Sequence, residues 1–187
     1  MDSKEEFLSI VNQYIKRDGI DNLMAYLEKS DFFTAPASTR FHDSYECGLM
    51  EHSLRTYHHL KKLVKAYDLT DISEESIAIV SLFHDLCKID CYDIDKRWKK
   101  NENNEWESYT TYSFNEKRKY GGHGAKSAFI VQFYIRLTFE EATAINCLMG
   151  PNGNDFSCMD AYRENSLAFL LHTADMASTI EMLNEKL

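Results

Sequence analysis

The sequence predicts an all-α fold, a bundle of about six or seven helices with a small β-hairpin insert at about residues 91–114. Three observations support this class. Only 2 Pro and 7 Gly occur in 187 residues, so few positions favour a break in a helix. Apolar residues recur with the period of an α-helix in several separate segments. A single stretch, residues 90–122, lacks this period and is rich in aromatic side chains.

Four helices are expected in the first half of the chain, because apolar residues there fall on one helical face. Their approximate ranges are 3–17, 21–27, 48–67 and 74–88. The segment Ser3-Lys4-Glu5-Glu6 predicts a capping box at the start of the first helix, and Asp71–Glu74 predicts a cap for the fourth. Pro36 and small polar residues predict an ordered loop over 32–45.

The insert, about 90–122, is expected to form two strands, Tyr92–Lys99 and Glu105–Phe114, around the polar turn 101–104. Its aromatic residues have two interpretations. In the first, they pack a solvated hairpin onto the helices. In the second, the hairpin is a lid or specificity element, because basic residues alternate with Trp98 and suit a nucleotide or a short single strand.

Further helices are expected after the insert. One begins near residue 123, and its glycine-rich start favours close approach of an anion. Thr138–Glu141 predicts a capping box for a helix that ends near Gly150. Asn165 is expected to cap the last helix, which extends to about Glu185.

Composition and charge narrow the class of protein. Apolar residues make up 44% and charged residues 27% of the chain, which is typical of a globular protein of one domain, 1–187. No apolar run approaches the ~20 residues of a membrane span, and the acidic N-terminus is unlike a signal peptide. With 5 Cys and no paired spacing, we expect reduced thiols and a cytoplasmic location. A net charge of −9 disfavours duplex DNA as a partner.

A histidine and a carboxylate, His84 and Asp85, interrupt a strongly apolar segment. Neutral imidazole and carboxylate are common ligands of divalent metals. Adjacent residues of a helix point about 100° apart, so both side chains can border a single ion. The alternative is a hydrogen-bonded His–Asp pair at the end of a helix, since every buried polar atom needs a partner.

Two other polar residues lie on apolar helical faces. His52 has the ordinary interpretation of a core histidine. Asp175 is more informative, because an acid in so apolar a helix is costly unless it is paired or binds a metal. His172 precedes it by one helical turn and is expected either to hydrogen-bond Asp175 or to act as a ligand.

Four segments in order, GLMEHS, FHDLCK, GGHGAKS and LHTADMAS, resemble the HD-domain superfamily of metal-dependent phosphohydrolases. The resemblance covers about 35–177 and is closest to small stand-alone HD proteins of bacteria and their phages. It implies a single HD-type helical bundle. It also implies a metal site formed by His52, His84, Asp85 and Asp175.

The resemblance implies roles for several other residues. Lys88 would contact phosphate or act in acid–base chemistry, although a solvated cation at a helix end is equally compatible. Arg40 and His42, in the loop before the first ligand, are expected to bind substrate, although Arg40 is equally compatible with an ordinary surface arginine. His123 would hold a second ion, contact phosphate or act as a general acid. Related sequences often have histidine where this one has Leu148, which cannot bind a metal.

We therefore expect one divalent ion (Mn, Fe, Ni, Co, Zn or Mg), with a transition metal favoured by the mixed nitrogen and oxygen ligands. The predicted function is hydrolysis of a phosphate ester of a nucleotide or a nucleic-acid end, with Asp85 as the proton acceptor. The predicted partner is a small phosphorylated substrate. Alternatives are a non-catalytic nucleotide-binding HD module, a 3′→5′ exonuclease-like HD nuclease and an HD oxygenase. Cys87 and Cys91 are expected to be buried thiols rather than zinc ligands.

Overall fold

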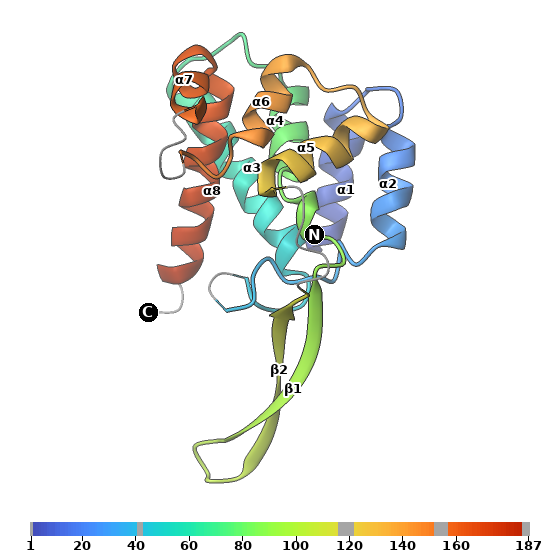
Figure 1. The fold of residues 1–187 in the computed structure, drawn as a ribbon, viewed down its shortest axis with the longest axis vertical. Coiled ribbons are helices and arrows are strands. Elements are labelled where there is room, and N and C mark those ends of the chain that lie inside the picture. The colour runs from blue at the N-terminus through green and yellow to red at the C-terminus, as the bar shows by residue number, and fades with distance from the viewer. Residues whose placement is uncertain (1, 41–42, 116–121, 152–156, 185–187) are drawn as a thin grey trace.

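Helices account for most of the chain in the computed structural model, which describes residues 2–40, 43–115, 122–151 and 157–184 (Figure 1). The helices of the first half are α1 (Ser3–Tyr14), α2 (Ile20–Lys29), α3 (Gly48–Ala66) and α4 (Glu74–Phe83). A short 3₁₀ turn, η1 (Leu86–Lys88), leads to strands β1 (Tyr92–Lys100) and β2 (Trp106–Phe114). The helices of the second half are α5 (His123–Tyr134), α6 (Phe139–Asn146), α7 (Ser157–Glu164) and α8 (Ser166–Asn184). The expected helical class and the hairpin insert are therefore confirmed, with more helices in the described residues than the six or seven predicted.

Helix α4 is the centre of the bundle. Every residue from Ile77 to Phe83 is buried, and the helix contacts α1, α3 and α6. Helix α3 packs against both α4 and α8. An aromatic cluster in which the Phe7 ring lies 6.2 Å from that of Phe83 and 5.4 Å from that of Phe32 fixes α1 against α4. Because the core surrounds α4 on all sides, the residues that follow its last turn are held inside the protein.

The ends of several helices differ from the expected ones. Helix α4 ends at Phe83, not near Lys88, because the backbone leaves the helical conformation at Asp85, with φ −109° and ψ 19°. Asp2 rather than Ser3 is the N-cap of α1, and Glu5 accepts a hydrogen bond from the Asp2 backbone at 3.3 Å. Ser3 is already helical, so the capping box starts one residue earlier than predicted.

The caps of α6, α4 and α8 lie in the segments that were predicted to hold them. Thr138 and Glu141 form the expected capping box of α6, in which each side chain accepts from the other residue's backbone N–H. Ser73 caps α4 by accepting from Ser76 N–H at 3.0 Å, within the segment expected to do so. The last helix begins after Asn165 as predicted. Helix α7 was not predicted, because its short polar segment has few apolar residues to mark a helical face.

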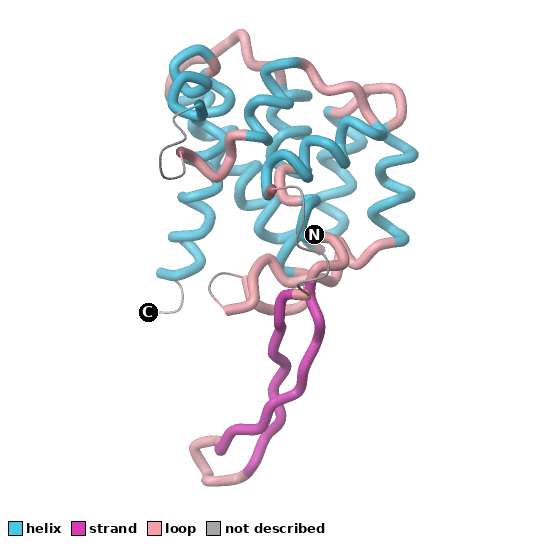
Figure 2. Tube along the Cα trace, in the orientation of Figure 1, coloured by secondary structure: helices cyan, strands magenta, loops and turns pink. Residues whose placement is uncertain are grey.

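The hairpin is a two-stranded antiparallel sheet whose register pairs Tyr92 with Phe114 at its base and Lys100 with Trp106 near its turn. The side chain of Asn101 stabilises the turn by accepting two backbone N–H groups at 3.0 and 2.9 Å. The hairpin projects away from the helices (Figures 1 and 2). Most of its side chains are exposed, so the interpretation in which its rings pack on the bundle holds only at its base.

Among the described residues, no helix combines the length and the apolar character needed to cross a membrane.

Candidate metal centre

His84 directly follows α4 and is completely buried. Its Nδ1 lies 2.7 Å from the backbone oxygen of Ser81. A carbonyl oxygen only accepts, so Nδ1 carries the hydrogen and the other ring nitrogen, Nε2, has a free lone pair in the neutral ring. Nε2 is buried and has no hydrogen-bond partner. It lies 3.5 Å from Asp85 Oδ2 and 3.7 Å from Asp175 Oδ1. The turn after α4 thus directs a nitrogen without a hydrogen-bond partner at two carboxylates.

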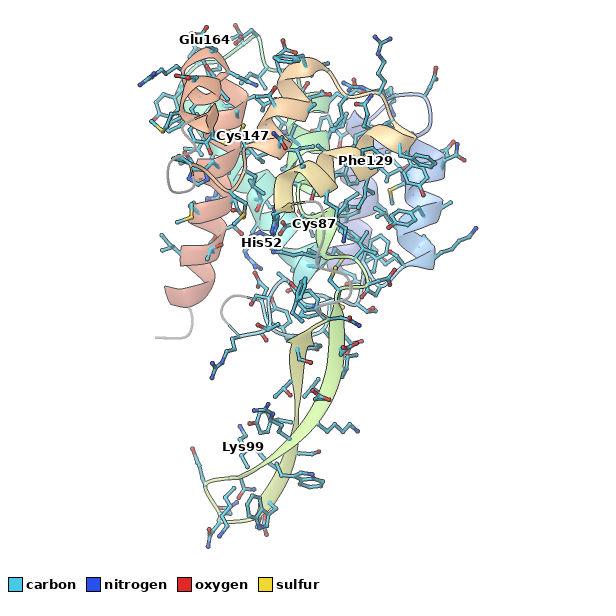
Figure 3. The ribbon with its side chains drawn as sticks, viewed as in Figure 1. His52, Cys87, Lys99, Phe129, Cys147 and Glu164 are labelled. Carbon is cyan, nitrogen blue, oxygen red and sulfur yellow. The ribbon has the colours of Figure 1, made fainter. Side chains whose placement is uncertain are left out.

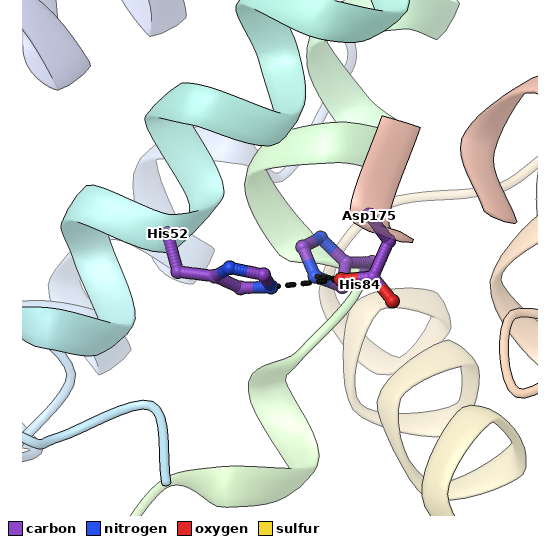
Figure 4. Close-up of side chains that lie close together, drawn as sticks. All are labelled: His52, His84 and Asp175. Atoms are coloured by element: carbon purple, nitrogen blue, oxygen red, sulfur yellow. Dashed lines mark hydrogen bonds and ion pairs between the residues drawn. The ribbon is translucent and has the colours of Figure 1, made fainter. Parts of the chain in front are cut away.

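His52 and Asp175 complete this cluster from helices α3 and α8 (Figure 4). His52 Nε2 lies 2.8 Å from Asp175 Oδ1 and 3.7 Å from Asp85 Oδ2. The His52 and His84 rings are 5.2 Å apart between centroids. Ligand atoms of His52, His84 and Asp175 lie within 4.8 Å of one another. Three elements far apart in the sequence therefore present two imidazoles and two carboxylates to one small volume.

Asp85 also contacts two cations, Lys88 through the same oxygen that faces the histidines and His123 through the other oxygen. Its Oδ2 lies 2.6 Å from Lys88 Nζ, and its Oδ1 lies 2.6 Å from His123 Nε2. The 3₁₀ turn η1 brings Lys88 back toward Asp85, three residues earlier. His123 is the first residue of α5, and Gly124 allows this helix end to pack closely, since a Cβ there would overlap the backbone oxygen of Asn146. Asp85 is thus shared between the His52–His84 side and the Lys88–His123 side.

The pKa values follow from burial and these contacts. Burial raises the pKa of Asp85, but Lys88, His84 and His123 together hold that pKa well below its usual value. Burial lowers the pKa of His123, and attraction to Asp85 outweighs it and raises the pKa to about 10. Burial likewise lowers the pKa of Lys88, yet Asp85 keeps it raised. Lys88 and His123 are therefore positively charged beside an ionised Asp85.

The two central histidines differ. Burial lowers the pKa of His52, and its hydrogen bond with Asp175 does not compensate for this. Burial also lowers the pKa of His84, but attraction to Asp85 and Asp175 raises it above its usual value. The carboxylate field at His84 Nε2 attracts any cation, whether a proton or a metal ion.

His52 is supported from behind by residues that the sequence did not single out. Its Nδ1 lies 3.2 Å from Ser178 Oγ and 3.6 Å from Asp43 Oδ2. Asp43 is fully buried and forms an ion pair with Arg55. Gly48, one turn before His52, lets the loop pass over α3, because a Cβ there would overlap the backbone oxygen of Asp43. An acid in a polar loop has no local pattern that marks it as buried.

Cys87 lies next to Asp85 and His123, a position that the sequence analysis did not predict. The thiol is buried, as expected, and its sulfur lies within 4.8 Å of ligand atoms of Asp85 and His123. The backbone N–H of Cys87 donates to Ser127 Oγ at 3.1 Å, which fixes η1 against α5. Leu148 is buried and its side chain offers no ligand. Asp85, Cys87 and His123 form a second group able to hold a metal ion among the described residues.

The remaining predicted site residues, His172, Arg40 and His42, are not found in the ligand cluster among the described residues. His172 neither pairs with Asp175 nor joins the metal-ligand groups found among the described residues. Its Nδ1 donates to the backbone oxygen of Leu148 at 2.6 Å, and its ring stacks on Tyr162. Arg40 is exposed in the loop before α3 and does not contact this cluster within the described part of the chain. His42 lies outside the described residues.

Comparison with known proteins gave no matching family model, no matching curated protein and no matching solved structure.

Proposed function

We propose that this chain is a metal-dependent phosphohydrolase of the HD type that cleaves a phosphate ester of a nucleotide or of a nucleic-acid end. The observation that carries the proposal is His84 Nε2, a buried nitrogen without a hydrogen-bond partner that faces two carboxylates. A buried polar atom without a partner is costly, and a neutral imidazole with its Nδ1–H bound to a carbonyl is the usual form of a metal-binding histidine.

The ligand set proposed for the ion is His52, His84, Asp85 and Asp175. Without an ion, His52 Nε2 donates to Asp175, since an ionised carboxylate only accepts. To bind an ion, His52 needs the tautomer with hydrogen on Nδ1, and Ser178 Oγ and Asp43 Oδ2 are acceptors on that side. Mixed nitrogen and oxygen ligands favour a transition metal over Mg²⁺. A divalent ion supplies Lewis acidity, which polarises a phosphoryl oxygen and lowers the pKa of water.

Charge supports phosphate as the group that binds next to the ion. Two neutral imidazoles and two carboxylates carry a charge of −2, which a divalent ion neutralises. Lys88 and His123 then remain as excess positive charge beside the site. Cations held in a largely buried site stabilise the negative charge that develops on a phosphoryl group during its transfer. These two residues are proposed to contact the phosphate oxygens.

The hydrolysis adds water across a P–O bond. The water oxygen bonds to phosphorus, the ester P–O bond breaks, and the leaving oxygen takes a proton. Asp85 is the proposed acceptor of the water proton because it lies between the ligand cluster and the two cations. Protonated His123, which contacts Asp85 at 2.6 Å, is the nearest donor for the leaving oxygen.

The test is hydrolysis of p-nitrophenyl phosphate, bis-p-nitrophenyl phosphate and a panel of nucleotides, with Mn²⁺, Fe²⁺, Co²⁺, Ni²⁺, Zn²⁺ and Mg²⁺ added in turn. We expect turnover of at least one ester with a transition metal, and a loss of about 10³-fold or more in Asp85→Asn. Asp160→Asn, an exposed acid on α7, is the matched control and should keep full activity. Metal binding with no turnover of any ester would replace this proposal with the non-catalytic binding module.

A further inference from the structure

One face of the hairpin carries its largest rings. Side chains alternate between the two faces of a strand, so residues 92, 94, 96, 98 and 100 of β1 share a face with their partners on β2. We call this surface the ring face. Its rings are Tyr92, Trp98, Trp106, Tyr112 and Phe114.

The rings far from the bundle are exposed. Trp98 and Trp106 have 64% and 65% of their surface accessible, and Ile94 between them and the bundle has 70%. Exposed apolar residues that lie next to one another on one surface can mark a binding site. A lone two-stranded hairpin is also marginally stable in water. The ring face therefore has the character of a binding surface.

Charge on the hairpin is divided between its faces. The ring face carries Lys96 and Lys100 and has no acidic residue among its paired positions. The reverse face carries two cations, Arg97 and Lys99, together with all three acids of the paired positions, Asp93, Asp95 and Glu107. Glu107 pairs with Lys99 at 3.3 Å. Lys100 Nζ lies 5.7 Å from the centre of the Trp106 ring. Flat rings alternating with cations suit a ligand made of aromatic bases and anions.

The base of the ring face follows the candidate metal centre closely in the chain. Strand β1 begins at Tyr92, four residues after Lys88, which is the last residue of η1. The Tyr92 ring packs edge-on against Phe114 at 5.9 Å, and its hydroxyl donates to the Ala37 backbone at 3.1 Å. Burial raises the pKa of the Tyr92 hydroxyl to about 12, with Lys88 acting to lower it and Asp85 to raise it. Figure 3 shows Lys99 at the far end of the hairpin, distant from His52 and Cys87. The rings thus form a track that leads outward from the site.

We propose that the ring face binds single-stranded nucleic acid, whose bases stack on the rings while one end lies at the metal centre. This inference rests on the proposed phosphohydrolase function and names the substrate class as an oligonucleotide. Each strand has 9 residues, or about 30 Å of length, which a stacked strand spans with no more than about nine nucleotides. Unpaired bases are required because ring stacking uses the exposed faces of the bases.

The test measures anisotropy of fluorescein-labelled oligothymidylates of three to fifteen nucleotides with the full chain, in EDTA and with Mn²⁺. Affinity should rise with length up to about nine nucleotides and then level off. Trp98→Ala and Trp106→Ala should each weaken binding at least five-fold, the lower limit for loss of one stacked base. Tyr109→Ala, a ring on the reverse face of the same strands, is the matched control and should change affinity less than two-fold.

The outcomes separate this inference from the proposed function. Ring-dependent binding in EDTA supports the inference even if no ester is hydrolysed. The inference is wrong, and the proposed function stands, if the protein hydrolyses small esters but either binds no oligonucleotide or binds it equally well after both tryptophan substitutions. Light scattering of the same variants tests a second copy as the occupant. If both tryptophan variants convert a dimer to a monomer and the wild type binds no oligonucleotide, a second copy covers the ring face and the inference is wrong.

Discussion

Replacing Lys88 by methionine removes a charge that sits against a buried carboxylate. The Lys88 side chain is 12% exposed and that of Asp85 is 3% exposed, with 2.6 Å between Nζ and Oδ2. Breaking a buried ion pair costs about 3–5 kcal/mol, because the remaining charge has lost its partner. His123 still contacts Asp85, so the low end applies, and we expect a loss of about 3 kcal/mol in the free energy of unfolding. For a chain of this length, this corresponds to a Tm lower by roughly 6–12 °C.

A bound divalent ion should reduce this cost, because it gives Asp85 a second positive partner. The assay is urea unfolding of the wild type and Lys88→Met, each in EDTA and with saturating Mn²⁺. We expect the difference between the two proteins to fall by at least half when Mn²⁺ is present. Arg163→Met is the control, since the Arg163–Asp160 pair is 70% and 75% exposed and is worth about 0–1 kcal/mol. Equal effects of the two substitutions in EDTA would refute the reasoning.

Three other predictions concern the same region. The pKa of His123 is raised to about 10 from a usual 6.5, so protonated His123 stabilises the fold fully below about pH 6.5 and loses this effect as the pH rises toward 10. Metal-free protein should therefore unfold at a lower urea concentration at pH 10 than at pH 7. The difference between the two pH values should be smaller in His123→Gln. Gly48→Ala should destabilise by about 1–3 kcal/mol in urea unfolding, because the new methyl overlaps the Asp43 backbone; a change below 0.5 kcal/mol would count against this packing. Cys87→Ser should leave metal content unchanged by mass spectrometry, because the proposed ligand set of His52, His84, Asp85 and Asp175 does not include Cys87. Loss of a second equivalent of metal would show that Cys87 is a ligand.

Helix positions were largely predictable, because apolar period and capping residues are local properties. Thr138 and Asn165 marked helix starts correctly for this reason. The end of α4 was not predictable, since the residues from His84 to Lys88 have no helix-breaking type. The exit from the helix depends on tertiary contacts such as the bond from Cys87 N–H to Ser127.

The cluster of His52, His84, Asp85 and Asp175 was predicted by resemblance and by the cost of burying such residues. Their convergence requires three elements to pack together, which no local pattern shows. Asp43 went unrecognised because its loop is polar and its partner Arg55 follows twelve residues later on another element. His172 was misjudged because it shares a helical face with Asp175, whereas its ring packs against Tyr162 and the Leu148 backbone.

The most direct test of the metal site is the metal content of the wild type and His84→Ala after reconstitution and removal of free ions, measured by inductively coupled plasma mass spectrometry. His84 is the informative position because its buried Nε2 makes no hydrogen bond that an ion would need to replace. We expect about one equivalent of a transition metal in the wild type and less than about one tenth of that in His84→Ala. Equal metal content in the two proteins, or none in the wild type, would contradict the proposed metal site.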